Sequence, residues 1–267
     1  MPELPEVETI RRTLLPSVSG QTVAEVVVRE RRLRQELAAE FGARLTGRTV
    51  TTLRRAGKYL LFDLDDGSVW MIHLGMSGSL ATSGGEMERH DHVVIRLANG
   101  VLVTYNDPRR FGCMKVIARD ADEIAALGVD PLSSEFTAMH LRDLCRGRRR
   151  PIKSLLMDQR LVAGLGNIYA SEILFRAGVR PTRRAHTLRV REIDAIHAAT
   201  GEVLREALQW GGSSISDYRD GNGERGGFQD RFRVYQRSGE SCSRCGTIIR
   251  ARVLAGRSSF YCSACQK

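Results

Sequence analysis

Three features are missing from the 267-residue sequence, and each absence excludes a class of protein. No apolar run approaches the roughly 18 to 20 residues that a membrane-spanning helix needs, so a soluble protein is expected. The start of the chain lacks the basic patch and long apolar run of a secretory signal peptide. Internal repeats, coiled-coil heptads and low-complexity tracts are also absent, which excludes solenoid and fibrous proteins.

Lysine is scarce in this strongly basic chain. Only four of the 41 basic residues are lysines, and these are Lys58, Lys115, Lys153 and Lys267. The formal net charge of +10 favours an anionic partner, such as nucleic acid or a membrane surface. A genome-wide preference for arginine can cause this bias, so the bias alone indicates no function. Because lysine, unlike arginine, can be tuned to give or take protons, each of the four merits closer attention.

The N-terminal part of the chain has the pattern of β-strands. Short alternating runs of β-branched and aromatic residues occupy much of residues 22–107. Between two such runs stands Asn99-Gly100, a strong signal for a two-residue hairpin. Residues 1–118 therefore predict a mostly antiparallel β-sandwich domain that also carries an N-terminal helix.

The pattern changes beyond the β domain. Over residues 119–227 the apolar spacing becomes helical and is interrupted by Gly and Pro, which predicts a second, helical domain. Residues 211–232 are rich in Gly, Ser and charge and are interpreted as a mobile loop. The third domain, residues 228–267, contains four cysteines. The predicted fold class is therefore α+β and multidomain.

The four cysteines near the end of the chain form two C-x2-C pairs separated by 16 residues, namely Cys242 with Cys245 and Cys262 with Cys265. Each pair suits a tight turn and the gap suits a β-hairpin, so four thiolates can surround one tetrahedral zinc ion. An iron–sulfur cluster or a redox pair is the alternative, which the symmetric spacing disfavours. The other two cysteines are isolated and are interpreted as small buried thiols.

Two stretches of the helical domain suit phosphate binding. In "MDQRLVAGLGNIYASE", glycines allow a tight turn before a helix that starts at Asn167, and helix N-termini bind phosphate. An ordinary helix corner is the alternative. The upstream run "CRGRRRPIK" includes Arg149 and Lys153, and a solvated charged face is its alternative interpretation.

The stretch "NDPRRFG" predicts a turn with Arg109 and Phe111 at or near its tip. An arginine beside an aromatic ring on a loop can insert into duplex DNA, where one group bonds to base edges and the other separates bases. A turn whose ring folds back into the core is the alternative. Met76, flanked by glycines in "HLGMSGSL", presents the same choice.

Three glutamates, Glu3, Glu6 and Glu8, lie among the first residues of this basic chain. A helix start explains them, because a first turn tolerates proline and the positive end of the helix dipole favours carboxylates. That interpretation leaves Pro2, next to the initiator methionine, without a role.

Taken in order, "MPELPEVET", "GKYL", "HLGMSGSL", "DPRRFG", "GLGNIYASE" and the four-cysteine tail resemble the formamidopyrimidine-DNA glycosylases across essentially the whole chain. The resemblance implies a β-sandwich domain, a helix–two-turn–helix domain and a zinc finger, with double-stranded DNA bound between them. It also implies a bifunctional base-excision repair enzyme, a DNA glycosylase and abasic-site lyase, that removes 8-oxoguanine and formamidopyrimidines. One structural zinc ion and no organic cofactor are expected.

The resemblance also supplies roles for residues. In the family the initiator methionine is removed and the exposed proline, here Pro2, is the nucleophile. An α-amine titrates near about 8, against about 10.4 for lysine, so it is already partly free base at neutral pH. Glu3 matches the general acid, Lys58 the lysine that aids β-elimination, and Arg257 the arginine linked to δ-elimination.

Other positions match the DNA contacts of the family. Chemistry on a base requires the base to leave the stack. Met76, Arg109 and Phe111 match the trio that fills the resulting gap, with Arg109 facing the orphaned cytosine. His90 and Arg149 match further DNA contacts, and Lys153 and Asn167 match residues that grip phosphates beside the lesion. The loop around residues 216–226 matches the loop that closes over the extruded base.

Two other hypotheses compete with an oxidised-purine glycosylase. One is an endonuclease VIII-like enzyme that prefers oxidised pyrimidines, which the trio of Met76, Arg109 and Phe111 disfavours. The other is a non-catalytic zinc-finger DNA-binding protein, which has no need for Pro2, Glu3, Lys58 and Arg257 together. A monomer without membrane attachment is expected, located in the cytoplasm and associated with the nucleoid.

Overall fold

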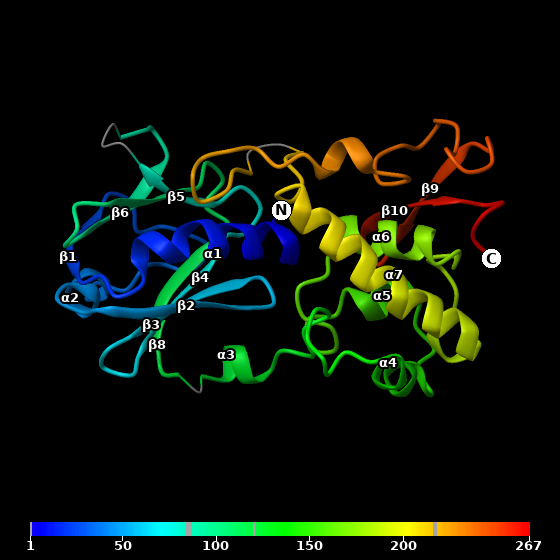
Figure 1. Cartoon of the computed structure of the whole chain (residues 1–267), viewed down its shortest axis with the longest axis horizontal. Helices are drawn as coiled ribbons and strands as arrows, with labels where there is room; N and C mark the ends of the chain where they lie inside the picture. Colours follow the sequence, from blue (N-terminus) through cyan, green and yellow to red (C-terminus); the bar gives the residue numbers. More distant parts are fainter. Residues whose placement is uncertain (1, 84–86, 120, 216–217) are drawn as a thin grey trace. The chain divides into compact units, whose positions relative to one another are not determined.

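The computed structural model describes residues 2–83, 87–119, 121–215 and 218–267 (Figure 1). The chain forms two compact units, which are described separately. The first contains the residues up to Ala125 together with Trp210–Gln229, and the second contains Ala126–Gln209 and Asp230–Lys267. In the described residues, no helix is long and apolar enough to cross a membrane.

The first unit is built from two four-stranded antiparallel sheets. One sheet has the order β1-β6-β7-β5 and the other the order β2-β3-β4-β8. The strands are β1 (Val23–Val28), β2 (Val50–Ala56), β3 (Tyr59–Leu64), β4 (Val69–His73), β5 (Ser79–Ser83), β6 (Asp91–Leu97), β7 (Leu102–Asn106) and β8 (Cys113–Ile117). A hairpin joins β6 to β7 at Asn99-Gly100 as predicted, but its loop has three residues rather than two. The Leu97 amide donates to the Val101 carbonyl and the Gly100 amide donates to the Leu97 carbonyl, and Gly100 has a positive φ whereas Asn99 does not.

Helix α1 (Leu4–Val18) supplies one side of the core of the first unit. It contacts β2 and β3 of one sheet and β5 of the other. Its apolar residues Val7, Ile10 and Leu14 are fully buried and share one cluster with residues of both sheets, such as Trp70. The short helices α2 (Phe41–Leu45) and α3 (Asp122–Ala125) complete this unit.

A buried carboxylate fixes α1 to the neighbouring sheet. Glu8 accepts hydrogen bonds from Arg11 and Arg12 on its own helix, and it pairs with Arg55 of β2 at 3.1 Å. Burial acts to raise the pKa of Glu8, but the hydrogen bonds from Arg11 and Arg12 and the charge of Arg55 outweigh it and lower the pKa to about 2. The helix is therefore held to the sheet by an ion pair as well as by apolar packing.

The segment 210–229 packs with the first unit although it follows the helical part of the chain. Its composition predicts a mobile loop, yet its described residues are hydrogen-bonded to regular structure. The Gly221 amide donates to Thr13 Oγ1 on α1 at 2.9 Å, and the Gly221 carbonyl accepts from the Thr82 amide of β5 at 2.8 Å. Residues 216 and 217 lie outside the described residues.

The second unit is helical and ends in a hairpin. Its helices are α4 (Ala138–Cys145), α5 (Ile152–Leu156), α6 (Asn167–Arg176) and α7 (Val190–Gln209), with one short 3₁₀ turn, η1 (Ala185–Thr187), between α6 and α7. A second 3₁₀ turn, η2 (Phe228–Arg231), precedes the hairpin of β9 (Ile249–Leu254) and β10 (Arg257–Cys262). Helix α6 contacts both α7 and β10, so it joins the helices to the hairpin. The mixed α+β fold class predicted from the sequence is confirmed.

Candidate active site and nucleic-acid interface

Pro2 and Glu3 form the buried entry to α1. Glu3 is the N-cap of the helix and makes a capping box with Glu6: the Glu3 side chain accepts from the Glu6 amide, and Glu6 Oε2 accepts from the Glu3 amide at 2.8 Å. The backbone beside Pro2 is therefore fixed by two reciprocal hydrogen bonds. Met1 lies outside the described residues, so its removal stays a prediction.

Glu6 also connects this first turn to the segment 210–229. Its Oε1 accepts from the Ser213 amide at 2.7 Å and from Ser213 Oγ at 2.9 Å, and the whole side chain is buried. The Tyr218 hydroxyl donates to the carbonyl of Glu6 at 3.2 Å. A Cβ on Gly212, which has a φ of +79°, would lie 2.8 Å from Glu6 Oε1. One carboxylate thus touches both the residue after Pro2 and the segment 210–229, which contains the loop around residues 216–226 predicted to cover an extruded base.

Glu6 is absent from the set of site residues predicted from the sequence. The capping-box spacing of Glu3 and Glu6 is the local signal that points to the hydrogen bond between them. The bond to Ser213 has no local signal, because the two residues are 207 positions apart.

Lys58 lies in the turn between β2 and β3 and is buried, which is unusual for a lysine. His73, at the end of β4, pairs with Tyr59 in the sheet. Burial, together with the charges of Lys58 and Arg34, lowers the pKa of His73 to about 4. His73 Nδ1 accepts from the Gly75 amide at 3.0 Å, so the ring proton of the neutral imidazole sits on Nε2. The sequence alone indicates no more than a structural role for His73, because its buried cationic surroundings come from other parts of the chain.

Met76 and Phe111 are exposed on two neighbouring loops. The side chain of Met76 is 42% exposed and that of Phe111 is 41% exposed, so Phe111 does not fold back into the core. The Arg109 guanidinium lies 4.7 Å from the centre of the Phe111 ring, a cation–π contact. His90 precedes β6, and its carbonyl accepts from the amide of Asp107 at 3.1 Å. The first unit therefore contains seven of the predicted site residues: Pro2, Glu3, Lys58, Met76, His90, Arg109 and Phe111.

Lys153 on α5 is buried, and its ammonium group donates to three oxygens of the second unit. The acceptors are Asn167 Oδ1 at 2.7 Å, Ser259 Oγ at 2.8 Å and the Ser258 carbonyl at 3.0 Å. The first acceptor begins α6 and the other two lie on β10. Because Lys153 holds the amide oxygen of Asn167, the NH2 group of that side chain faces away from Lys153. Arg149, between α4 and α5, is exposed.

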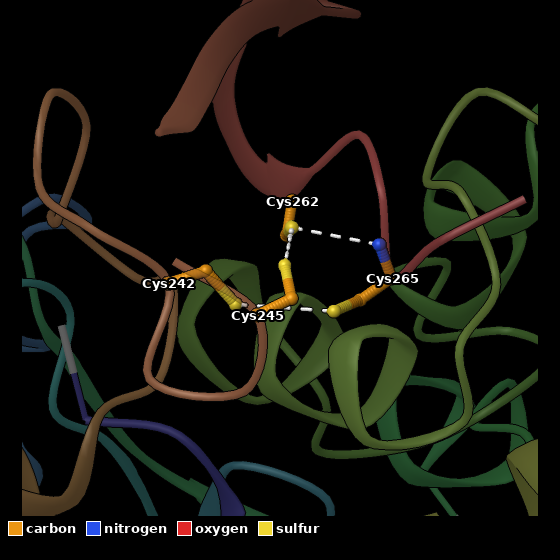
Figure 2. Close-up of side chains that lie close together, drawn as sticks. All are labelled: Cys242, Cys245, Cys262 and Cys265. Carbon is orange, nitrogen blue, oxygen red and sulfur yellow. Dashed lines mark hydrogen bonds between the residues drawn. The ribbon is translucent and has the colours of Figure 1, made fainter. Parts of the chain in front are cut away.

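The four cysteines of the tail lie together (Figure 2). Their sulfur atoms are all within 4.8 Å of one another, with 3.9 Å between Cys242 and Cys265 and 3.5 Å between Cys245 and Cys262. Four ligands at about 2.3 Å from a tetrahedral zinc ion would be separated by similar distances. Burial and hydrogen bonds with the other thiols raise the pKa of Cys265, whereas hydrogen bonds with Thr247 lower the pKa of Cys245. Because like charges repel, four thiolates this close together need a cation among them. The cysteine set fits one zinc ion.

The hairpin after the first cysteine pair carries arginines on its exposed face. Arg250 and Arg252 alternate along β9, and Arg257 begins β10, where it pairs with Leu254 across a two-residue turn. Both turn residues, Ala255 and Gly256, have positive φ, as a type I′ turn requires. Another buried carboxylate holds this end of the unit, because Glu172 of α6 accepts three backbone amides at residues 233–235, at distances of 2.8 to 3.0 Å.

Comparisons with known families cover nearly all of the chain. Residues 1–114 match the formamidopyrimidine-DNA glycosylase N-terminal domain, and residues 127–219 match the H2TH domain of the same glycosylases. Residues 239–267 match the zinc finger found in FPG and IleRS.

Relatives match over their full length. The chain is 47% identical to a formamidopyrimidine-DNA glycosylase of Azorhizobium caulinodans and 46% identical to one of Cereibacter sphaeroides, in each case over 100% of both chains. It is similar to the crystal structure of MutM (Fpg) from Thermus thermophilus, with a TM-score of 0.88, 42% identity and coverage of 99% of this chain and 98% of that one. Its TM-score to Lactococcus lactis Fpg in complex with abasic-site DNA is 0.89, with 35% identity and 99% coverage of both.

Proposed function

Because the chain belongs to the formamidopyrimidine-DNA glycosylase family, we propose that it is a base-excision repair enzyme for oxidised purines in duplex DNA. It releases 8-oxoguanine and formamidopyrimidines as a glycosylase and then cuts the strand as an abasic-site lyase. The observation that carries this proposal is the full-length match, because the N-terminal domain of these glycosylases, their H2TH domain and the zinc finger are matched in one chain.

Solved complexes of a relative support the substrate class. Lactococcus lactis Fpg has been crystallised with abasic-site DNA, and a mutant of that protein with DNA that contains Fapy-dG. The mutant complex has a TM-score of 0.90 to this chain, with 35% identity over 100% of both. The net charge of +10 suits DNA as a partner, because the phosphate backbone of DNA is negatively charged.

Covalent chemistry is assigned to Pro2. Once Met1 is removed, the secondary amine of Pro2 attacks C1′ of the damaged nucleoside, and the bond from C1′ to the base breaks with its electron pair leaving on the base. Opening of the sugar ring gives a cationic iminium between Pro2 and C1′. This cation withdraws electrons and acidifies C2′, so loss of a C2′ proton expels the 3′ phosphate in β-elimination, and the 5′ phosphate follows in δ-elimination.

Three further residues are assigned to proton transfer and phosphate departure. Glu3 is the general acid that assists opening of the sugar ring, and its adjacency to Pro2 in a fixed helix cap supports this role. Lys58 aids β-elimination, and its burial, which is unusual for a lysine, supports a functional assignment. Arg257 is assigned to δ-elimination, supported by its exposed place beside the hairpin turn.

DNA contacts are assigned to groups in both units. Met76, Arg109 and Phe111 fill the gap left by the extruded nucleotide, with Arg109 facing the orphaned cytosine. His90 and Arg149 contact the duplex. Asn167 binds a phosphate with its NH2 group. Lys153 contributes through Asn167, because its ammonium group already donates to protein oxygens.

One zinc ion, held by Cys242, Cys245, Cys262 and Cys265, supplies the folding energy of the arginine-bearing hairpin. Without a metal, a hairpin of two strands has little core of its own. We place the protein in the cytoplasm with the nucleoid, as a monomer, because its substrate is chromosomal DNA.

Excision from a panel of duplexes, each with one lesion, tests the proposal. We expect release of 8-oxoguanine and formamidopyrimidine opposite cytosine, and slower release of oxidised pyrimidines. A preference for oxidised pyrimidines would instead indicate an endonuclease VIII-like enzyme. Binding without any excision would indicate a non-catalytic DNA-binding protein.

A further inference from the structure

We propose that Ser77 and Asp107 form a clamp, a set of hydrogen bonds that fixes the positions of Met76, Arg109 and Phe111 relative to one another. Asp107 is then a positioning residue for the repair of duplex DNA. The inference rests on the proposed function, because the register of these side chains matters only if they enter a gap in the duplex. Neither member of the clamp is assigned a step in the proposed mechanism.

The carboxylate of Asp107 is fully buried directly beneath exposed side chains. Its Oδ1 accepts from Ser77 Oγ at 2.6 Å. Its Oδ2 accepts from the Tyr105 hydroxyl at 2.9 Å and from the Gly112 amide at 2.9 Å. Hydrogen bonds to an ionised acceptor are about twice as strong as neutral ones, so this group fixes all three partners.

The hydroxyl of Ser77 joins the two loops. It donates to Asp107 and accepts from the backbone amide of Arg109 at 3.2 Å. Ser77 directly follows Met76, and Gly112 directly follows Phe111. The clamp therefore holds the backbone next to Met76, at Arg109 and next to Phe111, which are the positions from which the three side chains project.

The backbone of Asp107 is fixed as well. Its amide donates to the carbonyl of His90, and its carbonyl is bonded to His92 Nε2 at 2.8 Å and accepts from the Arg110 amide at 3.2 Å. Arg110 has a φ of +56°, a conformation that costs free energy for any residue other than glycine, and its side chain pairs with Glu30 at 3.1 Å. A strained turn and a buried charge in one loop both cost stability, which indicates that the loop is built to hold its side chains in a fixed position.

The two loops leave no space between them. A Cβ on Gly75 would overlap the backbone carbonyl of Phe111, and a Cβ on Gly112 would overlap the Tyr105 hydroxyl. Because the loops touch here, a shift of the Asp107 turn is transmitted to the loop of Met76. A buried carboxylate is a costly way to join two loops if only stability is required, since apolar residues of similar size do this at least as well.

The clamp predicts a separation between two activities of one protein. Processing of a lesion in duplex DNA needs the gap to be filled and the opposite base to be contacted. Cleavage at an abasic site in single-stranded DNA needs the chemistry of Pro2 but has no opposite strand. Loss of the clamp should therefore reduce the first activity and spare the second.

The test compares Ser77→Ala with Thr200→Val, which also deletes one buried hydroxyl but lies on α7, where that hydroxyl donates to the carbonyl of Ile196. For Ser77→Ala we expect kcat/KM on an 8-oxoguanine:cytosine duplex to fall about tenfold, the worth of one charge-assisted hydrogen bond. The preference for cytosine over adenine opposite the lesion should fall with it. Cleavage of single-stranded abasic DNA should stay within about twofold, and the control variant should match the wild type in all three assays.

Asp107→Asn provides a second variant. Its amide can keep one oxygen on Tyr105 and Gly112 while its NH2 group donates to Ser77 Oγ, so we expect folding to be kept and the same selective loss to appear in part. Duplex activity and opposite-base preference at wild-type levels in both variants would overturn the clamp, as would equal losses on duplex and single-stranded DNA. A wild-type protein that neither excises 8-oxoguanine nor cleaves abasic DNA would instead overturn the proposed function on which the clamp rests.

Discussion

Replacing Glu6 with glutamine tests how the N-terminal turn is joined to the segment 210–229. Glu6 Oε2 accepts from the Glu3 amide, and Glu6 Oε1 accepts from the amide and hydroxyl of Ser213. Glutamine has the same size but offers one oxygen and one NH2 group. In either orientation its NH2 group faces a buried backbone N–H, at Glu3 or at Ser213, so one donor meets another.

The expected cost follows from these contacts. A buried donor left without an acceptor costs about 1–3 kcal/mol, and the hydrogen bonds that remain lose the contribution of the charge. A total of about 3 kcal/mol corresponds to a factor of about one hundred in an equilibrium constant. Because Tyr218 and Gly221 still hold the segment to α1, we expect local detachment rather than global unfolding.

Hydrogen exchange at the Ser213 amide is the direct assay. In Glu6→Gln, exchange at this position should be up to about one hundredfold faster, while the core strands keep their protection. Excision of 8-oxoguanine should fall over the same range. Glu36→Gln, a change of the same chemistry at an exposed glutamate, should alter neither quantity. Unchanged protection at Ser213 in Glu6→Gln would refute the argument that this carboxylate holds the segment.

Three further predictions concern stability, phosphate contacts and the metal. The folded-state pKa of Glu8 is about 2, below the ordinary 4.5, so its stabilisation, at most about 3 kcal/mol, is fully present above pH 4.5 and is lost as the pH falls from about 4.5 to about 2. In denaturant unfolding at several pH values, Glu8→Gln should reduce the slope of stability against pH in that window, and a slope equal to that of the wild type would contradict the assignment. Lys153→Met should weaken DNA binding but keep the salt dependence of log K, because the Lys153 ammonium donates to protein oxygens and neutralises no phosphate. Arg149→Met should instead reduce the slope by about 0.9, and equal slope changes in the two variants would contradict the different roles. Cys245→Ser should remove zinc, measured by atomic emission, and abolish binding to lesion DNA while the circular dichroism of the β domain persists; tight binding by the zinc-free variant would show that the hairpin is dispensable.

Local signals in the sequence predicted the parts of the fold that depend on neighbouring residues. Asn99-Gly100 marks the hairpin between β6 and β7 because its loop needs a positive φ at Gly100, which glycine adopts at low cost, although the loop has three residues rather than the predicted two. The spacing of the two C-x2-C pairs predicted a zinc site, and the four sulfur atoms do lie within reach of one zinc ion. The turn signal spans two residues and each cysteine pair spans four, so both can be recognised without knowledge of the rest of the chain.

Long-range contacts could not be predicted in this way. The glycine-rich composition of residues 211–232 indicates a loop, but its anchoring on α1 depends on Glu6, more than two hundred positions earlier. Lys153 belongs to a basic run that resembles a solvated face, yet it is buried by β10, which lies about one hundred positions later. The sequence indicates Asp107 only as part of a turn, because its partner Ser77 comes from another strand connection. Burial of these polar groups is a property of the tertiary packing.

The central claim of the account is that the amine of Pro2, freed by removal of Met1, forms the covalent intermediate with the sugar of the damaged nucleotide. Borohydride reduction during reaction with an 8-oxoguanine duplex, followed by mass spectrometry of the cross-linked peptide, tests it most directly. The account predicts one stable adduct on the N-terminal peptide, attached at the nitrogen of Pro2. An adduct on Lys58 or another lysine, or strand cleavage with no adduct at all, would contradict it.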